Sequence, residues 1–261
     1  MELVFIGSTF MLLMAVFIVL FVLFYQRRQD EQRLKIQSME AEFQNKLLEV
    51  SMAATESERR RIAQDLHDDI GAMLSITKLT ANALHLKMGI NNTNIQLVEQ
   101  IKSTLDETVE NIRRISRELI PTTLEHFGLP AAIQEFAAMS NSSDNLKITF
   151  EYNGPDQKRL PNRTELMLYR IAQELINNAV KHSEGTSIHI QAVYSTNQIL
   201  LIVEDNGIGF DLENVKNRPV PGLGLDSIEG RLRIINGKIQ YETTPHHGCC
   251  ARVVLQQGSL K

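Results

Sequence analysis

Hydrophobic and polar positions divide the chain into stretches with different periodicities. From Leu3 to Tyr25 nearly every residue is apolar, whereas Gln26 to about Arg61 is polar, with apolar residues every three or four positions. Two stretches with a helical repeat follow as far as Pro121, and beyond it apolar runs of strand length alternate with helical ones. Because side chains repeat every 3.6 residues on a helix and every two on a strand, this order predicts helices first and a mixed α/β part last.

The first stretch has the length and apolarity of a membrane-spanning helix. As a helix, Leu3 to Tyr25 would extend about 34 Å, slightly more than the hydrocarbon core of a bilayer. The start Met1-Glu2 lacks the basic residues of a cleaved signal peptide, and Arg27 and Arg28 follow the stretch directly. Basic residues favour the cytoplasmic side of a membrane. We therefore predict an uncleaved anchor over residues 1–25, crossing the inner (cytoplasmic) membrane once, with no extracellular sensing domain.

The next two stretches predict a helical stalk over residues 26–55 and a helical hairpin over residues 56–122. The first hairpin helix has a stripe of residues on one face: Ile62, Leu66, Ile70, Met73 and Thr77. The segment from Gly89 to Asn94 breaks the pattern, and the second helix has its own stripe: Val98, Ile101, Leu105, Val109, Ile112, Ile115 and Leu119. One hairpin alone leaves its stripe half exposed. We therefore predict a homodimer in which two hairpins form a four-helix bundle.

Residues 123–261 predict an α/β sandwich. The expected strands are Leu146–Tyr152, Ser187–Tyr194, Gln198–Glu204, Lys238–Thr243 and Ala251–Gln256, and the expected helices are Leu129–Met139, Asn162–His182 and Leu225–Asn236. Several strands with few but long helices indicate a sheet covered by helices on one face. The fold class predicted for the whole chain is thus α plus α/β.

Composition excludes some classes of protein. With 261 residues, a net charge of -4 and a pI near 6.0, the chain lacks the basic domain of a nucleic-acid-binding protein. We expect no direct contact with nucleic acid. The two cysteines, Cys249 and Cys250, are neighbours, and neighbouring cysteines rarely form a disulfide.

One histidine stands out in the first hairpin helix, within "ERRRIAQDLHDDIG", Glu58 to Gly71. His67 lies about 100° from Leu66 on a helical wheel, so its ring is expected to face solvent. Asp68 can accept a proton from one ring nitrogen and leave the other nucleophilic. Gly71 leaves the adjoining surface open to a partner. Taken alone, a surface His-Asp pair is usually incidental.

Three further motifs follow in order. In "ELINNAVKH", Glu174, Asn178, Lys181 and His182 share one helix face, where an amide oxygen can ligate Mg²⁺ and the cations can neutralise phosphate oxygens. A solvated polar helix face is the alternative.

"EDNGIGF" places Asp205 beside a turn with Gly207 and Gly209, and "GLGLDSIEGR" opens a helix with Gly222 and Gly224, as phosphate-binding loops do. The polar segment Asp211 to Pro221 between them predicts a mobile lid. Each glycine pair alone is a weak signal, but the three motifs in this order and spacing are a strong one.

Taken together, these motifs resemble those of two-component sensor histidine kinases, in the subfamily that partners NarL/FixJ-type response regulators. The stretch around His67 is similar to the phosphoacceptor box, and the other three are similar to the N, G1 and G2 boxes of the GHKL ATP-binding fold. The resemblance spans roughly Glu56 to Leu255. It implies a membrane-anchored kinase that uses ATP and Mg²⁺ to phosphorylate itself, then passes the phosphoryl group to an aspartate of a separate regulator.

The resemblance also implies a role for each matched residue. His67 would be phosphorylated with Asp68 as its base, Asn178 would hold Mg²⁺, and Glu174 would belong to the same metal and water network. Lys181 and His182 would contact the phosphates, and Asp205 would bind the adenine amino group. The pocket and its lid would be shaped by Gly207, Gly209, Gly222 and Gly224.

Two positions depart from the family pattern. Ala72 stands where many members have a glutamine that positions water for dephosphorylating the regulator, and Cys249 stands where a threonine is usual near the adenine. Two alternatives therefore stay open: a GHKL-type ATPase that phosphorylates no histidine, and a dimeric scaffold without catalysis.

Overall fold

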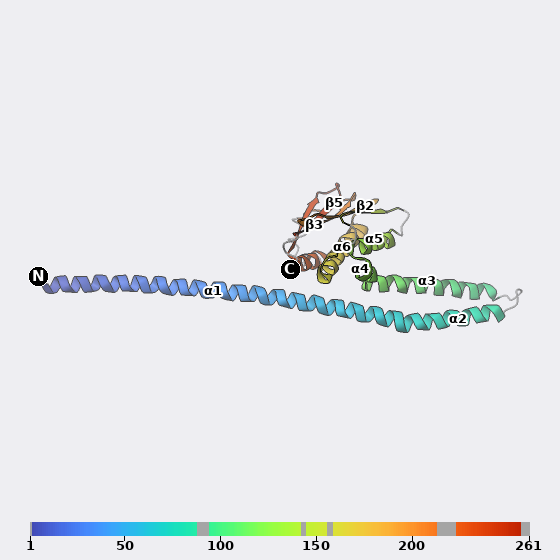
Figure 1. Ribbon diagram of the computed structural model, residues 1–261, viewed down its shortest axis with the longest axis horizontal. Helices are drawn as coiled ribbons and strands as arrows, with labels where there is room; N and C mark the ends of the chain where they lie inside the picture. Colours follow the sequence, from blue (N-terminus) through green and yellow to red (C-terminus); the bar gives the residue numbers. More distant parts are fainter. Residues whose placement is uncertain (1, 88–93, 142–144, 156–158, 213–222, 257–261) are drawn as a thin grey trace. The chain divides into compact units, whose positions relative to one another are not determined.

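The computed structural model describes residues 2–87, 94–141, 145–155, 159–212 and 223–256 of the chain. The chain divides into two compact units, Met1–Met52 and Ala53–Lys261. The first unit is part of one helix, α1 (Glu2–Asp65), which continues into the second unit (Figure 1). The predicted stalk lies within α1.

The predicted membrane anchor falls partly outside the description. Although the backbone of α1 begins at Glu2, the side chains of residues 2–10, 12, 15, 16 and 19 are not described. Among the described residues, no helix combines the length and the apolar character needed to cross a bilayer.

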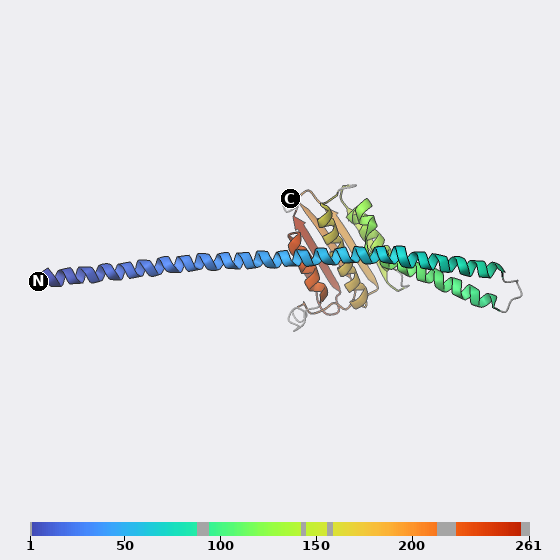
Figure 2. The ribbon, with the colours of Figure 1, turned by 90° about the horizontal axis from the view of Figure 1, so that it is seen from below.

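The second unit begins with the predicted helical hairpin. After α1 the chain makes a π-helical turn, η1 (Leu66–Ile70), and continues as α2 (Gly71–Lys87). The returning helix is α3 (Ile95–Leu119), which lies beside α2 in both views (Figures 1 and 2). An ion pair of 2.5 Å between Lys78 of α2 and Asp106 of α3 joins the two helices.

The π-helical turn corrects the predicted face of the first hairpin helix. The backbone N–H of Gly71 donates to the carbonyl of Leu66, five residues earlier, instead of the fourth residue back as in an α-helix. The wider turn shifts the phase of α2, so Met73 and Thr77 do not share a buried face with Leu66, and Met73 is 67% exposed. Ala81, which follows Thr77 in the same stripe of the sequence, is buried as predicted, and Leu74 lines a cavity next to α3.

The face predicted for the second hairpin helix is confirmed in part. Val98 is buried, and Leu105, Val109 and Ile112 are half-buried, as the stripe requires. Ile101 and Ile115 are exposed.

A five-stranded sheet and its helices make up the rest of the unit. The strands are β1 (Lys147–Asn153), β2 (Ser187–Tyr194), β3 (Gln198–Asp205), β4 (Gly237–Thr243) and β5 (Cys249–Gln256), in the order β1-β2-β3-β5-β4. β1 runs parallel to β2, and the other neighbouring pairs are antiparallel. The helices are α4 (Thr122–Phe127), α5 (Leu129–Ser140), α6 (Asn162–His182) and α8 (Leu223–Ile234).

Helices cover one face of this sheet, as the sequence predicted (Figure 2). On β2 and β3 alternate residues are buried, including Ile188, Ile190, Ile199 and Leu201, which is the pattern of a sheet packed on one side. The core of α6 faces them, with Leu168, Ile171 and Ile176 fully buried. The predicted sandwich is therefore confirmed, and the short helix α4 is an element that the sequence did not indicate.

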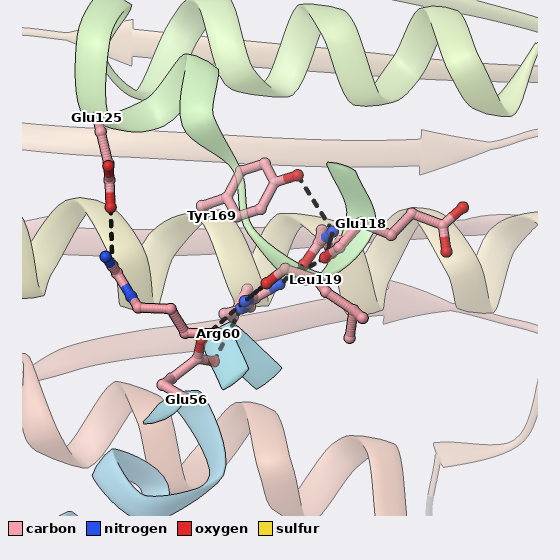
Figure 3. A network of polar contacts seen from close by, with 8 residues as sticks. Glu56, Arg60, Glu118, Leu119, Glu125 and Tyr169 are labelled. Carbon is pink, nitrogen blue, oxygen red and sulfur yellow. Dashed lines mark hydrogen bonds and ion pairs between the residues drawn. The ribbon is translucent and has the colours of Figure 1, made fainter. Parts of the chain in front are cut away.

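A buried ion pair holds α1, α3 and α6 together (Figure 3). The Arg170 side chain of α6 is 2% exposed, and its guanidinium donates to both carboxylate oxygens of Glu56 at 2.7 and 2.8 Å. It also donates to the carbonyls of Glu118 and Leu119 at the end of α3, at 3.0 and 2.8 Å. One turn along α1, Arg60 pairs with Glu125 of α4 at 2.7 Å. The hairpin and the sheet domain are thus joined by oriented polar contacts.

We expect Arg170→Met to lower the free energy of unfolding by about 3 kcal/mol, because the Glu56 carboxylate and two carbonyls lose their partner in a buried place. Urea denaturation of the purified protein measures this. The control is Arg61→Met, whose pairs with Glu58 and Asp65 are exposed. That control should change the stability by less than about 1 kcal/mol. Equal effects of the two substitutions would contradict the prediction.

Candidate active site

A cavity of about 450 Å³ lies where α6, α8 and the ends of β3 and β5 meet. Polar side chains in its wall come from α6 (Glu174, Asn178 and His182) and from the last residue of β3 (Asp205). The remaining lining is mostly apolar or small: Leu175, Ala179, Ser183, Val203, Gly209, Phe210, Gly224, Leu225, Tyr241, Cys249 and Ala251. A largely apolar cavity with a few polar groups is typical of a site for a small organic ligand.

The spacing on α6 explains why its polar residues meet in the cavity. Glu174, Asn178 and His182 are four residues apart, so they follow one another along one face of the helix. Leu168, Ile171 and Ile176 lie on the buried side. Lys181, one position before His182, is exposed and is not part of the cavity wall.

Two glycines allow the backbone to approach this face closely. A Cβ atom on Gly224 would overlap a carboxylate oxygen of Glu174 and lie 3.5 Å from the Asn178 amide nitrogen. A Cβ atom on Gly207 would overlap the carbonyl oxygen of Ser183, just after α6. The absence of these side chains lets the start of α8 and the turn after β3 pack closely against α6.

Asp205 is held in a fixed orientation at the mouth of that turn. The backbone N–H of Gly207 donates to its carboxylate at 3.0 Å. Burial raises the pKa of Asp205, and the hydrogen bonds from the backbone of Gly207 and Cys249 oppose this shift. A partly buried carboxylate with free acceptor capacity can recognise an N–H donor of a ligand.

The other candidate group, His67, lies in the π-helical turn of the hairpin. Its side chain is exposed, as the sequence predicted. Asp68 is exposed as well, and no hydrogen bond joins it to the His67 ring among the contacts of the described residues. Both residues line a second cavity of about 320 Å³ between α2 and α3.

Known protein families match the helical hairpin and the sheet domain separately. The family profile "Histidine kinase" matches residues 58–124, and the profile "Histidine kinase-, DNA gyrase B-, and HSP90-like ATPase" matches residues 163–259. Together the two profiles span more than half of the chain, in the order that the motifs predicted.

The chain belongs to the sensor histidine kinase family. Its first domain matches the histidine kinase profile, and its second matches the ATPase profile.

Two relatives of this chain are sensor histidine kinases. The kinase is 26% identical over 214 residues to the oxygen sensor histidine kinase NreB of Staphylococcus carnosus, covering 82% of this chain and 60% of that protein. It is 28% identical over 215 residues to the sensor histidine kinase ComP of Bacillus subtilis, covering 80% of this chain and 28% of that protein. The chain thus spans less than two thirds of the length of these relatives.

Among solved structures, the histidine kinase domain of the blue-light activated histidine kinase from Erythrobacter litoralis EL346 is similar to this chain. The TM-score is 0.48 and the identity 12%, over 72% of this chain and 96% of that one.

The structure brings most of the predicted site residues of the kinase together. The nucleotide cavity is lined by Glu174, Asn178, His182, Asp205, Gly209 and Gly224. Gly207 lies in the adjoining turn and Lys181 on the outer surface. Gly222 lies outside the described residues, as does most of the predicted lid. The roles assigned to all these residues remain predictions.

Sequence reasoning missed three arginines near the nucleotide cavity of the kinase. Arg59 of α1 and Arg231 of α8 lie close to Arg170, Glu56 and Glu174. Burial lowers the pKa of both Arg59 and Arg231, and the charges of the other arginines contribute. These residues come from three distant parts of the sequence, so no local spacing could have indicated them.

The sequence could have indicated the apolar walls of the cavity, and it did indicate Cys249 as a residue near the adenine. Val203 and Ala251 occupy alternate positions of apolar strands, and periodicity alone could have placed them on the helix-covered face. Cys249 pairs with Asp205 across β3 and β5. Burial raises the pKa of the Cys249 thiol to about 12, so it faces the cavity as a neutral S–H group.

Asp205→Asn should weaken ATP binding while sparing the fold. Because the folded-state pKa of Asp205 is raised, its ionisation disfavours the folded protein, and this loss develops as pH rises through the unfolded-state and folded-state pKa values. The neutral variant should therefore melt at the same temperature or higher at pH 8. Its dissociation constant for ATP should rise about tenfold, because a hydrogen bond to a charged acceptor is lost.

Calorimetric titration and thermal melting at pH 8 measure both quantities. Glu204→Gln is the matched control, because Glu204 is the preceding residue on β3 and its side chain is exposed. Unchanged affinity of Asp205→Asn for ATP would show that the carboxylate does not recognise the nucleotide.

Proposed function

We propose that the chain phosphorylates itself on His67 with Mg-ATP and then passes the phosphoryl group to an aspartate of a separate response regulator. The observation that carries this proposal is the presence, in one chain, of an exposed histidine in a helical hairpin and a cavity lined by residues of three nucleotide-binding motifs.

The cavity suits the adenine end of a nucleotide. Val203, Leu175 and Ala251 offer apolar walls, and Asp205 offers an acceptor for the adenine amino group. The polyphosphate would extend toward Asn178, His182 and Gly224. The arginines Arg59 and Arg231 near Glu174 add positive charge in this region.

The donor set also fits Mg²⁺. No group of three acidic, histidine or cysteine side chains among the described residues could hold a metal ion alone. The Asn178 amide oxygen and the Glu174 carboxylate are hard oxygen groups four residues apart on one face of α6, and Mg²⁺ accepts one or two protein ligands with phosphate oxygens. When bound, the ion neutralises phosphate charge.

The phosphoryl step then needs one nucleophilic ring nitrogen. The bond between the γ-phosphorus and the bridging oxygen breaks, its electron pair stays on ADP, and a nitrogen–phosphorus bond forms at His67. The proton on the other ring nitrogen passes to Asp68. Such a transfer depends mostly on positioning and charge neutralisation.

The receiving protein is proposed from the family resemblance and the relatives. The chain resembles kinases that partner NarL/FixJ-type regulators, and NreB and ComP are sensor histidine kinases by name. Ala72, four residues after Asp68, has no amide to orient a water molecule. We therefore infer that dephosphorylation of the regulator by that route is absent.

Labelling with γ-labelled ATP tests the kinase reaction. The full chain should acquire acid-labile, alkali-stable phosphate, and His67→Gln should acquire none because the accepting nitrogen is gone. His189→Gln is the control, because this histidine is in the sheet, away from both cavities. Label retained by His67→Gln would contradict the assignment, and ATP hydrolysis without any label would favour an ATPase.

We also propose a membrane anchor and a homodimer. Phe17, Leu20 and Phe24 of the apolar N-terminal stretch are exposed, which supports a lipid-facing helix at the inner membrane. In the hairpin, Met73 and Ile76 of α2 and Ile101 and Ile115 of α3 are exposed large apolar side chains. A second hairpin would cover them, which supports the four-helix bundle.

Deletion of residues 1–25 separates these two proposals. The shortened chain should leave the membrane fraction of lysed cells, because the apolar stretch is gone, and should still sediment as a dimer. The full chain should stay with membranes. A shortened chain that still sediments with membranes would contradict the anchor, and a monomeric mass would contradict the hairpin dimer.

A further inference from the structure

The cavity beside His67 contains polar groups that the proposed reaction does not use. It lies between the start of α2 and α3, with a volume of about 320 Å³. One side includes His67 of η1 and Gly71 of α2, and the α3 side includes Arg113 and Ser116. A Cβ atom on Gly71 would meet only the Leu66 carbonyl oxygen, at 3.8 Å. The space next to the phosphoacceptor is therefore open.

Among the residues that the structure describes, the Ser116 hydroxyl lacks the hydrogen bond that a serine in a helix usually makes. Helical hydroxyls commonly donate to the carbonyl four residues earlier. Several in this protein do so: Ser75, Thr77, Thr80, Thr104, Thr108 and Ser140. The Ser116 oxygen is buried and has no hydrogen-bond partner within the described part of the chain. It is thus a donor that can serve a group entering the cavity.

Arg113 adds positive charge at the rim of the same cavity. Its side chain is 62% exposed, and its ion pair with Glu110 is long, at 3.8 Å. An exposed pair of this kind holds a guanidinium weakly. Arg113 can therefore turn to a stronger anionic partner. Asp68 is the acid in the cavity wall, and in the proposed reaction it serves the ring nitrogen that is not phosphorylated.

The Ser116 hydroxyl and the Arg113 guanidinium match the chemistry of a phosphoryl group attached to the ring. Such a group has three strong acceptor oxygens and nearly two negative charges, which hydroxyl and guanidinium donors satisfy. We propose that the cavity between α2 and α3 receives the phosphoryl group of phosphorylated His67, with Ser116 as hydrogen-bond donor and Arg113 as counter-charge. This inference rests on the proposed function, and it makes Ser116 and Arg113 determinants of the lifetime of the phosphorylated state.

The test charges the full chain in detergent with phosphoramidate, a small phosphoryl donor that needs no nucleotide. The ³¹P resonance that His67→Gln lacks identifies phosphorylated His67, and its decay gives the lifetime. Ser116→Ala should move this resonance and shorten the lifetime about tenfold, because one hydrogen bond to a charged group is lost. Ser116→Thr, which keeps the hydroxyl, should restore both. Arg113→Gln should also shorten the lifetime, and Arg113→Lys should do so less.

Thr104→Ala is the matched control on α3, because the Thr104 hydroxyl is exposed and donates to the Gln100 carbonyl at 3.0 Å. It should leave the resonance and the lifetime unchanged. If Ser116→Ala leaves the resonance and the lifetime unchanged, as Thr104→Ala should, the Ser116 hydroxyl does not bind the phosphoryl group and the proposal is overturned. A chain that phosphoramidate charges at His67 but ATP does not would overturn the proposed kinase reaction alone.

Discussion

The arginine at position 170 is the constraint on which the arrangement of the second unit depends. A guanidinium that is almost wholly removed from water is costly unless all its donors are used. Here the donors are used by a carboxylate of α1, two carbonyls at the end of α3 and the side-chain oxygen of Gln173. The helix that leads to His67 and the helix that lines the cavity must therefore meet at one place, one turn before Glu174.

This meeting place has a consequence for phosphoryl transfer. Glu56 and His67 are three turns apart on the same stretch of chain, about 16 Å along a regular helix. The nucleotide cavity and the cavity beside His67 have no lining residue in common. The two candidate sites are thus separate in the described chain, and in the reaction we propose the γ-phosphoryl group has to pass from the first to the second. The polar contacts of Arg170 and Arg60 restrain movement of the sheet domain relative to the hairpin.

Local pattern predicted much of the fold and of the nucleotide site. The bounds of α6 match the expected ones because Pro161 begins the helix and an apolar period of 3.6 continues to its end. The i, i+4 spacing placed Glu174, Asn178 and His182 on one face for the same reason. The predicted face of α2 was wrong because a π-helical turn adds one residue, which a helical wheel with about 100° per residue does not include. The Glu56–Arg170 pair and the Ser116 hydroxyl depend on contacts between distant segments, so sequence spacing held no signal of them.

Because Gly207 lies directly against the Ser183 carbonyl, the motif after β3 and the motif on α6 depend on each other sterically. The turn after β3 and the end of α6 come from separate parts of the chain, yet one backbone fits against the other with no space for a methyl group. Any side chain at position 207 would displace the last turn of α6 and would move His182 with it. A substitution at position 207 therefore acts on the cavity wall through α6 as well as on its own turn.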